Sequence, residues 1–322
     1  MKVNFITSQP HAACSMFYFD ALKRIPSFSF YDQEIRKYDV ILVMTYDHAH
    51  LKKIREIHPT AKIGLIDPRN YKVEESLRYA DFIIIDSIEM QDYWSKIKKP
   101  MFRYAEYPDI PDFIKTHSDK RNISIGYHGN QIHLSCMQNT VTPALERLSK
   151  NYDIELVVMY SGSPPTGNEK WVPKGVKVKH VHWSMQAYNE LSKCDIGIAP
   201  NNLLHDEAEK EASKTSDMYN YSRDDFSLRF KMPSNFGRII VFGKLGIPVV
   251  ADFYPSALQY LSEDKLTGMV ACNSSGWEFC LEKLIVSHEL RQEMGDGLQN
   301  LVKSEFDFDN QNTKLLEFLR AL

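Results

Sequence analysis

Residues 229–252 read RFKMPSNFGRIIVFGKLGIPVVAD, which predicts a loop, a helix and a buried strand in succession. Gly243 and Gly246 let the helix pack closely and end. Pro248–Ala251 is a short apolar run, typical of a parallel strand that is covered on both faces. This order of elements predicts a crossover at the C-terminal edge of an α/β sheet.

Cationic and amide side chains gather where this helix should start: Arg229, Lys231, Ser234 and Asn235. Ser234 or Asn235 can cap the free backbone N–H groups of the first turn. A helix N-terminus beside Lys and Arg is a ready site for phosphate oxygens. The stretch therefore predicts a phosphate site, and the simpler alternative is an ordinary helix-to-strand turn with surface cations.

The same stretch resembles the donor-binding segment of GT-B glycosyltransferases, especially the family-four-like enzymes that build bacterial polysaccharides. Lys231, Ser234-Asn235, Arg238 and Gly246–Val250 match its outline of a Lys, a Ser-Asn pair, a basic residue and Gly-x-Pro-Val-Val. The resemblance implies an α/β fold of the GT-B type, with two Rossmann-like domains whose parallel sheets face each other across a cleft. One position departs from the outline: Val241 stands where many relatives carry the Glu that holds the donor's ribose, which puts that contact in question.

The chain is 322 residues long, enough for two domains that each bury a core. Its composition, 43% hydrophobic and 25% charged, is that of a globular protein. The net charge of −3 gives no basic surplus, so we expect no nucleic-acid partner. Apolar runs are shorter than the roughly 20 residues of a membrane helix, and the N-terminus lacks a secretory signal. We therefore expect a cytoplasmic protein.

No metal or cofactor motif stands out. The five cysteines are scattered without a CxxC pair, which argues against a disulfide framework or a structural zinc site. There is no His-Glu-x-x-His, and Asp307-Phe308-Asp309 lies near the C-terminus, away from the predicted cleft. The resemblance likewise implies a reaction without bound metal, with a nucleotide-diphosphate sugar as substrate and no cofactor.

Strand and helix patterns alternate through the first third of the chain, with strands predicted at Val3–Thr7, Val40–Met44, Lys62–Ile66 and Phe82–Ile85. Such alternation predicts a parallel sheet with helices on both faces. Ligands of these sheets bind beyond the carboxyl ends of the strands, where polar loops follow at Ser8–His11, Thr45–His48, Asp67–Asn70 and Asp86-Ser87. For each loop, the alternative is a capping or turn residue.

In GT-B enzymes these loops hold the acceptor, and Asp47-His48 resembles the family's common Asp-His pair. The family-four-like resemblance implies retention of configuration, in which the donor phosphate takes the acceptor proton and no protein base is required. An inverting enzyme would need a base, for which Asp47, His48 or His11 could serve. The sequence does not choose between the two outcomes.

Prolines and charges interrupt the periodicity at Pro108–Asp119, which predicts a linker. We place an acceptor domain at residues 1–118 and a nucleotide-sugar donor domain at residues 119–322. The family's chain often crosses back at its end, so we expect the final helix, Asn312–Leu322, to pack on the first domain.

Three loops of the second domain are candidate donor contacts. The strand Asn122–Tyr127 is followed by His128-Gly129-Asn130, which in GT-B enzymes lies beneath the nucleotide-sugar; it is not the Gly-x-Gly-x-x-Gly fingerprint of nicotinamide and flavin enzymes. The next two strands end near Ser161-Gly162 and Trp183, where relatives place the nucleobase. Trp183 could stack on the base or could be a packed core residue.

The polar segment between Asn201 and Ser227 is rich in both charges. Loops of this length are usually functional or disordered. We favour a lid over the donor, and the alternative is a solvated helix with charges at i,i+4 spacing.

These features together predict a glycosyltransferase that moves a sugar to a glycan or other hydroxyl acceptor, in bacterial surface polysaccharide or glycoconjugate synthesis. Lys231 and Arg238 would stabilise the leaving diphosphate, with Asn235 and the Gly129 loop holding phosphate oxygens. Two alternatives stay open: a sugar-nucleotide epimerase or hydrolase of the same fold, and a non-catalytic nucleotide-binding scaffold subunit. Lys96–Lys99 suggests peripheral attachment to the inner face of the membrane, or simply a solvated helix end.

Overall fold

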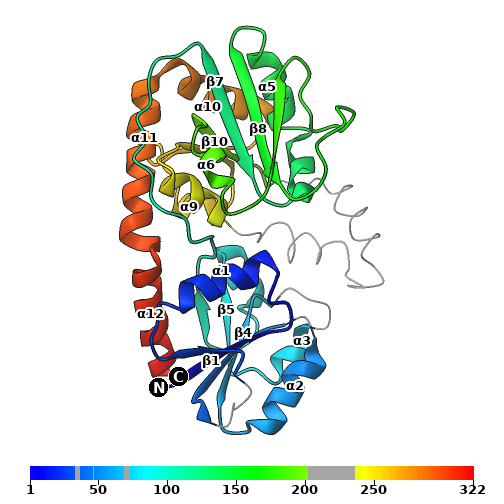
Figure 1. The fold of residues 1–322 in the computed structure, drawn as a ribbon, viewed down its shortest axis with the longest axis vertical. Coiled ribbons are helices and arrows are strands. Elements are labelled where there is room, and N and C mark those ends of the chain that lie inside the picture. Colours follow the sequence, from blue (N-terminus) through cyan, green and yellow to red (C-terminus); the bar gives the residue numbers. More distant parts are fainter. Residues whose placement is uncertain (33–36, 46, 69–72, 202–235) are drawn as a thin grey trace. The chain divides into compact units, whose positions relative to one another are not determined.

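The computed structural model describes residues 1–32, 37–45, 47–68, 73–201 and 236–322 (Figure 1). They form two parallel sheets of six strands each, in the orders β2-β1-β3-β4-β5-β6 and β12-β11-β10-β7-β8-β9. In the first sheet the order reverses after β2, so that β3 pairs with the other side of β1; in the second it reverses after β9, so that β10 pairs with the other side of β7. Such a reversal is typical of doubly wound α/β folds. The predicted architecture of two Rossmann-like parallel sheets is confirmed.

The chain divides into two compact units. The first comprises Met1–Asp109 and Phe306–Leu322, and the second contains the described residues 110–201 and 236–305. The division falls before the predicted boundary at 118, because the intervening segment bonds to the second unit. Phe113 N donates to Lys244 O at 2.7 Å, and His117 N donates to Gln292 Oε1 at 2.9 Å.

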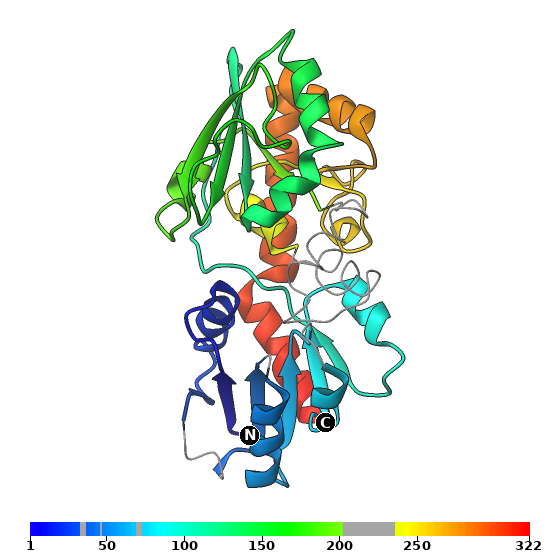
Figure 2. The same ribbon diagram turned by 90° about the vertical axis from the view of Figure 1, so that its right-hand side faces the viewer.

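In the first unit, apolar strands lie between two layers of helices. The strands are β1 (Val3–Thr7), β2 (Phe28–Phe30), β3 (Val40–Met44), β4 (Lys62–Ile66), β5 (Phe82–Ile85) and β6 (Met101–Arg103); the helices are α1 (Ala13–Leu22), α2 (His48–Ile57), α3 (Val73–Leu77), α4 (Ile88–Trp94) and α12 (Phe308–Ala321). Alternate residues of β3 face opposite layers, and Ile41 and Val43 join the core beneath α2 and α4. On the other layer α12, red in Figure 2, packs Phe318 against Phe82 and Phe102.

The second unit repeats this plan. Its strands are β7 (Asn122–His128), β8 (Asp153–Tyr160), β9 (Lys177–His182), β10 (Ile196–Ala199), β11 (Val249–Asp252) and β12 (Met269–Ala271). Its helices are η2 (Gln131–Met137), α5 (Val141–Leu148), α6 (Tyr188–Leu191), α9 (Gly237–Lys244), η4 (Ala257–Gln259), α10 (Ser274–Val286), α11 (His288–Leu301) and the π-helical turn η5 (Val302–Phe306), whose last residue belongs to the first unit. Leu145 of α5 and Trp277 of α10 share one apolar core with β7, whereas α9 packs Phe242 against β10 at Gly197.

Gly246 belongs to the run that matched the donor-segment outline, and the structure gives a physical reason for glycine at this position. Its φ of 66° is left-handed, and a Cβ there would lie 3.0 Å from Cβ of Lys115. His117 Nε2 donates to Gly246 O at 3.0 Å. The glycine thus ends α9 and lets the entering segment 110–118 lie directly on the turn.

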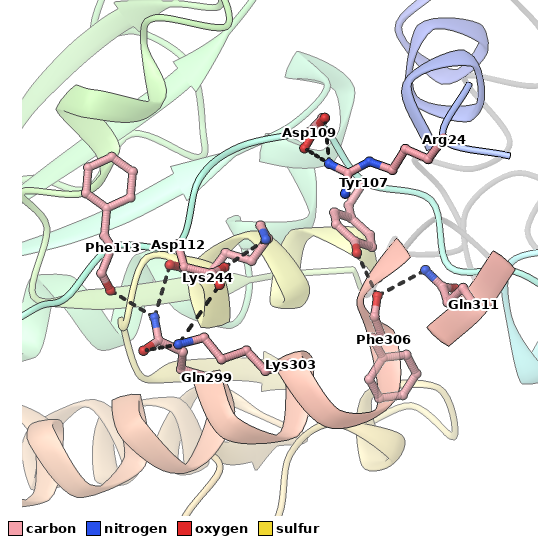
Figure 3. A network of polar contacts seen from close by, with 10 residues as sticks. All are labelled: Arg24, Tyr107, Asp109, Asp112, Phe113, Lys244, Gln299, Lys303, Phe306 and Gln311. Atoms are coloured by element: carbon pink, nitrogen blue, oxygen red, sulfur yellow. Dashed lines mark hydrogen bonds and ion pairs between the residues drawn. The ribbon is translucent and has the colours of Figure 1, made fainter. Parts of the chain in front are cut away.

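Among the described residues, the chain passes from the first unit to the second after Asp109 and returns after Glu305. On each side of both passages, side chains of the same unit hold the segment in place (Figure 3). In the second unit, Lys244 pairs with Asp112 at 2.8 Å, and Gln299 Nε2 donates to Phe113 O at 2.8 Å. In the first unit, Tyr107 Oη and Gln311 Nε2 both donate to Phe306 O, at 2.6 and 3.0 Å. The segments flanking residues 109 and 305 are therefore fixed by side chains of the unit to which they belong.

Candidate functional site

The second sheet brings three strand ends to one edge. β7, β10 and β11 are neighbours in the sheet and run parallel, so the loops after them open at the same edge. Arg238, in the first turn of α9, extends to this edge: Nη1 donates to Pro200 O at 3.0 Å and Nη2 to Asn201 Oδ1 at 3.2 Å. Only 8% of Arg238 is exposed. A buried guanidinium with fixed orientation is thus present where a ligand of an α/β sheet would bind.

The Gly129 loop lies against Arg238. Gly129 has a φ of 143°, and a Cβ there would lie 3.2 Å from both Cδ of Arg238 and Oη of Tyr127. Tyr127 Oη donates to Asn130 O at 2.7 Å, and the guanidinium carbon lies 6.0 Å from the Tyr127 ring centroid, a cation–π distance. A Cβ at position 129 would be closer than ordinary van der Waals contact to both side chains, so one of them would have to shift, and the φ of 143° independently favours glycine.

His128 supports the helix from inside. Its imidazole is 5% exposed, and Nε2 donates to Arg238 O at 3.2 Å. Burial, aided by the charge of Arg238 and opposed by that hydrogen bond, lowers the pKa of His128 to about 3. The imidazole is therefore neutral at physiological pH and holds the backbone of the residue whose side chain forms the cationic site.

Two residues of this edge were not predicted as site residues. Asp252 is 2% exposed; its Oδ2 accepts from Asn201 N at 2.6 Å and its Oδ1 from Trp277 Nε1 at 2.9 Å. Asn201 in turn contacts the Arg238 guanidinium. Asp252 could have been noticed in the sequence because it ends the apolar run VVAD. A charged side chain directly after a buried strand needs hydrogen-bond partners.

The predicted nucleobase loops lie farther along the same sheet, after β8 and β9. Ser161 and Gly162 are exposed, and a Cβ on Gly162, whose φ is 128°, would lie 3.0 Å from Gln131 Oε1. Trp183 is half-buried, and its Nε1 donates to Tyr188 Oη at 3.3 Å. Stacking of its ring on a nucleobase stays a prediction.

Two of the predicted acid–base candidates of the first unit, Asp47 and His48, lie at the start of α2, and the third, His11, lies between β1 and α1. Asp47 Oδ1 accepts from Ala49 N at 2.9 Å as the helix N-cap. His48 Nε2 lies 3.5 Å from Glu75 Oε2, and His11 is exposed. The capping alternative therefore describes Asp47 in this structure, and the catalytic roles of these residues stay predictions.

Several predicted residues lie outside the described residues: Lys231, Ser234, Asn235 and the polar segment after Asn201 up to Ser227. Helix α9 begins at Gly237 with Phe236 in the N-cap position, and the predicted cap at Ser234 or Asn235 lies outside the described residues. Phe236 makes no side-chain cap hydrogen bond and is buried.

Two kinds of feature are absent from the described residues: a cluster of metal-binding side chains and a membrane-spanning helix. Within those ranges, no group of three or more His, Cys, Asp or Glu side chains could hold a metal ion. Among the helices of the same part of the chain, none is long and apolar enough to span a bilayer.

Comparison with known proteins supports the fold. No family model and no curated protein matches the sequence. Solved structures do: Anabaena HepE in complex with UDP matches with a TM-score of 0.62 at 13% identity, covering 100% of both chains. A mutant of Staphylococcus aureus TarM, in complex with fondaparinux, α-GlcNAc-glycerol and UDP, matches with a TM-score of 0.55 at 10% identity over 86% of this chain and 55% of that one. A putative UDP-N-acetylglucosamine 2-epimerase from Listeria monocytogenes gives 0.54 at 10% identity over 99% and 95%. The chain has the GT-B fold, as predicted.

Proposed function

We propose that this protein is a glycosyltransferase that transfers a sugar from a nucleotide-diphosphate sugar to a hydroxyl acceptor. The observation that carries the proposal is Arg238, a buried, oriented cation at the carboxyl edge of the second sheet. HepE, similar in fold over its whole length, has been crystallised with UDP and with UDP-glucose. A uridine diphosphate sugar is therefore the donor we expect first.

The chemistry of transfer explains why such a cation is useful. Breaking the bond between sugar and diphosphate leaves negative charge on the departing phosphate oxygens. A guanidinium keeps its charge at every physiological pH and presents a planar fork of N–H donors that suits phosphate. Arg238 would stabilise the leaving diphosphate electrostatically, and the Gly129 backbone would approach the phosphates closely because it has no side chain.

We further propose a metal-independent, retaining reaction on a glycan or glycoconjugate acceptor, at the cytoplasmic face of a membrane in surface polysaccharide synthesis. The fixed guanidinium supplies charge compensation that other transferases take from a divalent cation. Asp47 is engaged as a helix cap, which favours proton transfer to the donor phosphate over a protein base. TarM, crystallised with a glycan and a glycosylated glycerol, is a precedent for such acceptors within this fold.

The primary test is a thermal-shift screen against UDP, GDP, ADP, CMP and dTDP. A ligand that binds only the folded state at a hundred times its dissociation constant adds about 2.7 kcal/mol to stability. We expect one diphosphate, UDP first, to raise the melting temperature of the wild type and of Lys244→Ala but not of Arg238→Ala. Lys244 is a matched control because it is a cation on the same helix, about 9 Å farther along its axis, paired with Asp112.

A second candidate function is sugar-nucleotide epimerisation or hydrolysis, which the Listeria neighbour favours. Incubation of the donor without acceptor separates the two. An epimer or free sugar appearing at the rate of turnover would support this candidate, whereas transfer only in the presence of an acceptor would support the glycosyltransferase. Nucleotide binding without any turnover would instead indicate a scaffold subunit.

A further inference from the structure

The residues that bind the guanidinium of Arg238 are themselves fixed by further hydrogen bonds. Its two acceptors, Pro200 O and Asn201 Oδ1, belong to the turn that directly follows β10. That turn is tied on both sides of Asn201: the Asn201 N–H donates to Asp252 Oδ2 at 2.6 Å, and Tyr254 Oη donates to Asn201 O at 3.4 Å. The orientation of Arg238 therefore depends on where Asn201 is placed.

Asp252 connects this turn to the core. Its other oxygen accepts from Nε1 of Trp277 at 2.9 Å, and Trp277 is fully buried in the apolar core beneath α10. A buried carboxylate that receives two N–H groups in fixed directions resists rotation. The end of β11, the turn after β10 and helix α10 thus meet at one side chain.

The distribution of charge along this chain of contacts is informative. Both acceptors of the Arg238 guanidinium are neutral oxygens, a carbonyl and a carboxamide, so they orient the cation without cancelling its charge. The carboxylate of Asp252 does not touch the guanidinium directly; it accepts hydrogen bonds from the backbone N–H of Asn201 and from Nε1 of Trp277. Within the described residues, no carboxylate oxygen forms an ion pair with Arg238. The arrangement keeps a full positive charge available for an anion.

We propose that Asp252 is a positioning residue for the donor diphosphate, acting through Asn201 to hold Arg238 in place before the donor binds. The inference rests on the proposed function, since it assumes that Arg238 meets the diphosphate. A cation placed in advance requires no reorganisation when charge develops on the leaving group. Asn201 is then the residue that transmits the position without neutralising the charge.

The test compares a nucleoside diphosphate with its nucleoside, because only the diphosphate can sense Arg238. Affinities of whichever of the four diphosphates UDP, GDP, ADP and dTDP stabilises the wild type, and of its nucleoside, are measured by calorimetry for wild type, Asp252→Asn, Arg238→Ala and the double variant. Asp252→Asn keeps the shape of the side chain, but its amide NH₂ group would then point at the N–H of Asn201 or of Trp277, and two donors cannot bond each other. We expect it to weaken the diphosphate about tenfold, leave the nucleoside unchanged, and add little to Arg238→Ala, as coupled neighbours do.

If Asp252 only stabilises the fold, the affinities for diphosphate and nucleoside should change in a different way. Equal losses for diphosphate and nucleoside, or losses that add fully in the double variant, would overturn the positioning role while leaving the proposed function standing. If none of the four diphosphates binds the wild type, the proposed function fails and the positioning role fails with it.

Asn201→Asp provides an independent variant should Asp252→Asn fold poorly. It is isosteric and retains the main-chain bonds of residue 201, but it sets a carboxylate against Arg238. We expect the diphosphate to bind at least tenfold more weakly, with nucleoside affinity retained. Unchanged diphosphate affinity in this variant would contradict the argument that a neutral oxygen is needed there.

Discussion

Arg238 and His128 show how two adjacent basic side chains take opposite states. The Arg238 guanidinium stays charged although only 8% of it is exposed, since arginine does not lose its proton in proteins. The buried imidazole of His128 instead has its pKa lowered to about 3 and carries no charge at neutral pH. Of the cations predicted for the diphosphate, Arg238 is the one that lies within the described residues, and it lies at the edge where the prediction requires it.

Replacing Arg238 by Ala should slow sugar transfer by roughly a hundredfold or more, the scale seen when one charge-stabilising donor is removed from an active site. Lys231→Ala should act similarly if Lys231 shares the role. Arg238→Lys should restore only part of the rate, because an ammonium cannot bond Pro200 O and Asn201 Oδ1 with a planar fork. Initial rates at varied donor concentration measure this, with Lys244→Ala as control. Wild-type turnover in Arg238→Ala would reject the assignment.

His117 should make stability depend on pH. Burial lowers its pKa from 6.5 to about 4 in the folded protein, partly offset by its bond to Gly246. Below pH 6.5 the unfolded chain binds a proton that the folded protein does not, so stability is full above that pH and falls as the pH drops towards 4. Between pH 7 and pH 5 this histidine alone should cost about 2 kcal/mol.

Urea unfolding of wild type and His117→Gln at both pH values measures that contribution. The variant should lose about 2 kcal/mol less than the wild type between pH 7 and pH 5. His180→Gln is the control, because His180 is only partly buried on edge strand β9. Identical losses in wild type and His117→Gln would show that His117 titrates normally.

At the scale of elements, the Gly246 turn shows how a sequence motif can have a structural reason. The left-handed φ and the contact with Lys115 both exclude a side chain. Gly246→Ala should therefore lower the free energy of unfolding by about 1–3 kcal/mol. Gly167→Ala is a matched control, since Gly167 has a φ of 89° but no atom within 4 Å of the added Cβ. A larger loss at 246 than at 167 would measure the packing contribution, and equal losses would deny it.

Helix α12 holds the first unit together through buried amides. Asn312 Oδ1 accepts from Tyr104 Oη at 2.8 Å, and its Nδ2 donates to Ala21 O at 2.9 Å. Asn312→Ala leaves both partners unpaired, which should cost about 2–4 kcal/mol. Hydrogen exchange should then rise in peptides of β1–β6 and stay unchanged in peptides of β7–β12. Thr313→Ala is the control, because it loses only an exposed hydrogen bond within α12, and it should change exchange in neither unit. A uniform rise in both units of the Asn312 variant would contradict the prediction.

Which elements could be predicted from sequence depends on how much pattern each contains. Fully apolar strands such as VILVM in β3 were located to the residue, whereas edge strands β2 and β6 have three residues each, too few to show a period. The chain from Gln131 to Leu148 forms η2 and then α5 instead of one continuous helix. Pro143 explains the break, because proline is tolerated only in the first turn of an α-helix.

The candidate site was predictable to the extent that it is local. Arg238 could be found because it matches the outline of the GT-B donor-binding segment within one continuous stretch of the chain. Asn201 and Asp252 are 51 positions apart, and only the parallel pairing of β10 with β11 brings them into contact. Hydrogen bonds between the ends of different strands leave no periodic signal in the sequence.

At the scale of the whole molecule, the proposed reaction assigns different tasks to the two units. The second unit contains the buried cation, the Gly129 loop and the exposed Ser161-Gly162 turn, all at the ends of its parallel strands. The first unit offers Asp47 and His48 at the corresponding edge of its own sheet. If the donor phosphate accepts the acceptor's proton, the first unit needs only to bind and orient the acceptor.

Chelation tests whether residues of the chain alone supply the positive charge for transfer. Because Arg238 is already held in place by Pro200 O and Asn201 Oδ1, we expect transfer to proceed at an unchanged rate after dialysis against EDTA. Added Mg²⁺ or Mn²⁺ should then change the rate by less than about twofold, the scale of ionic screening rather than of catalysis by a metal. The matched measurement is Arg238→Ala with and without Mn²⁺. Rescue of that variant by the ion would show that a cation can replace the guanidinium, whereas a strict metal requirement in the wild type would contradict the mechanism.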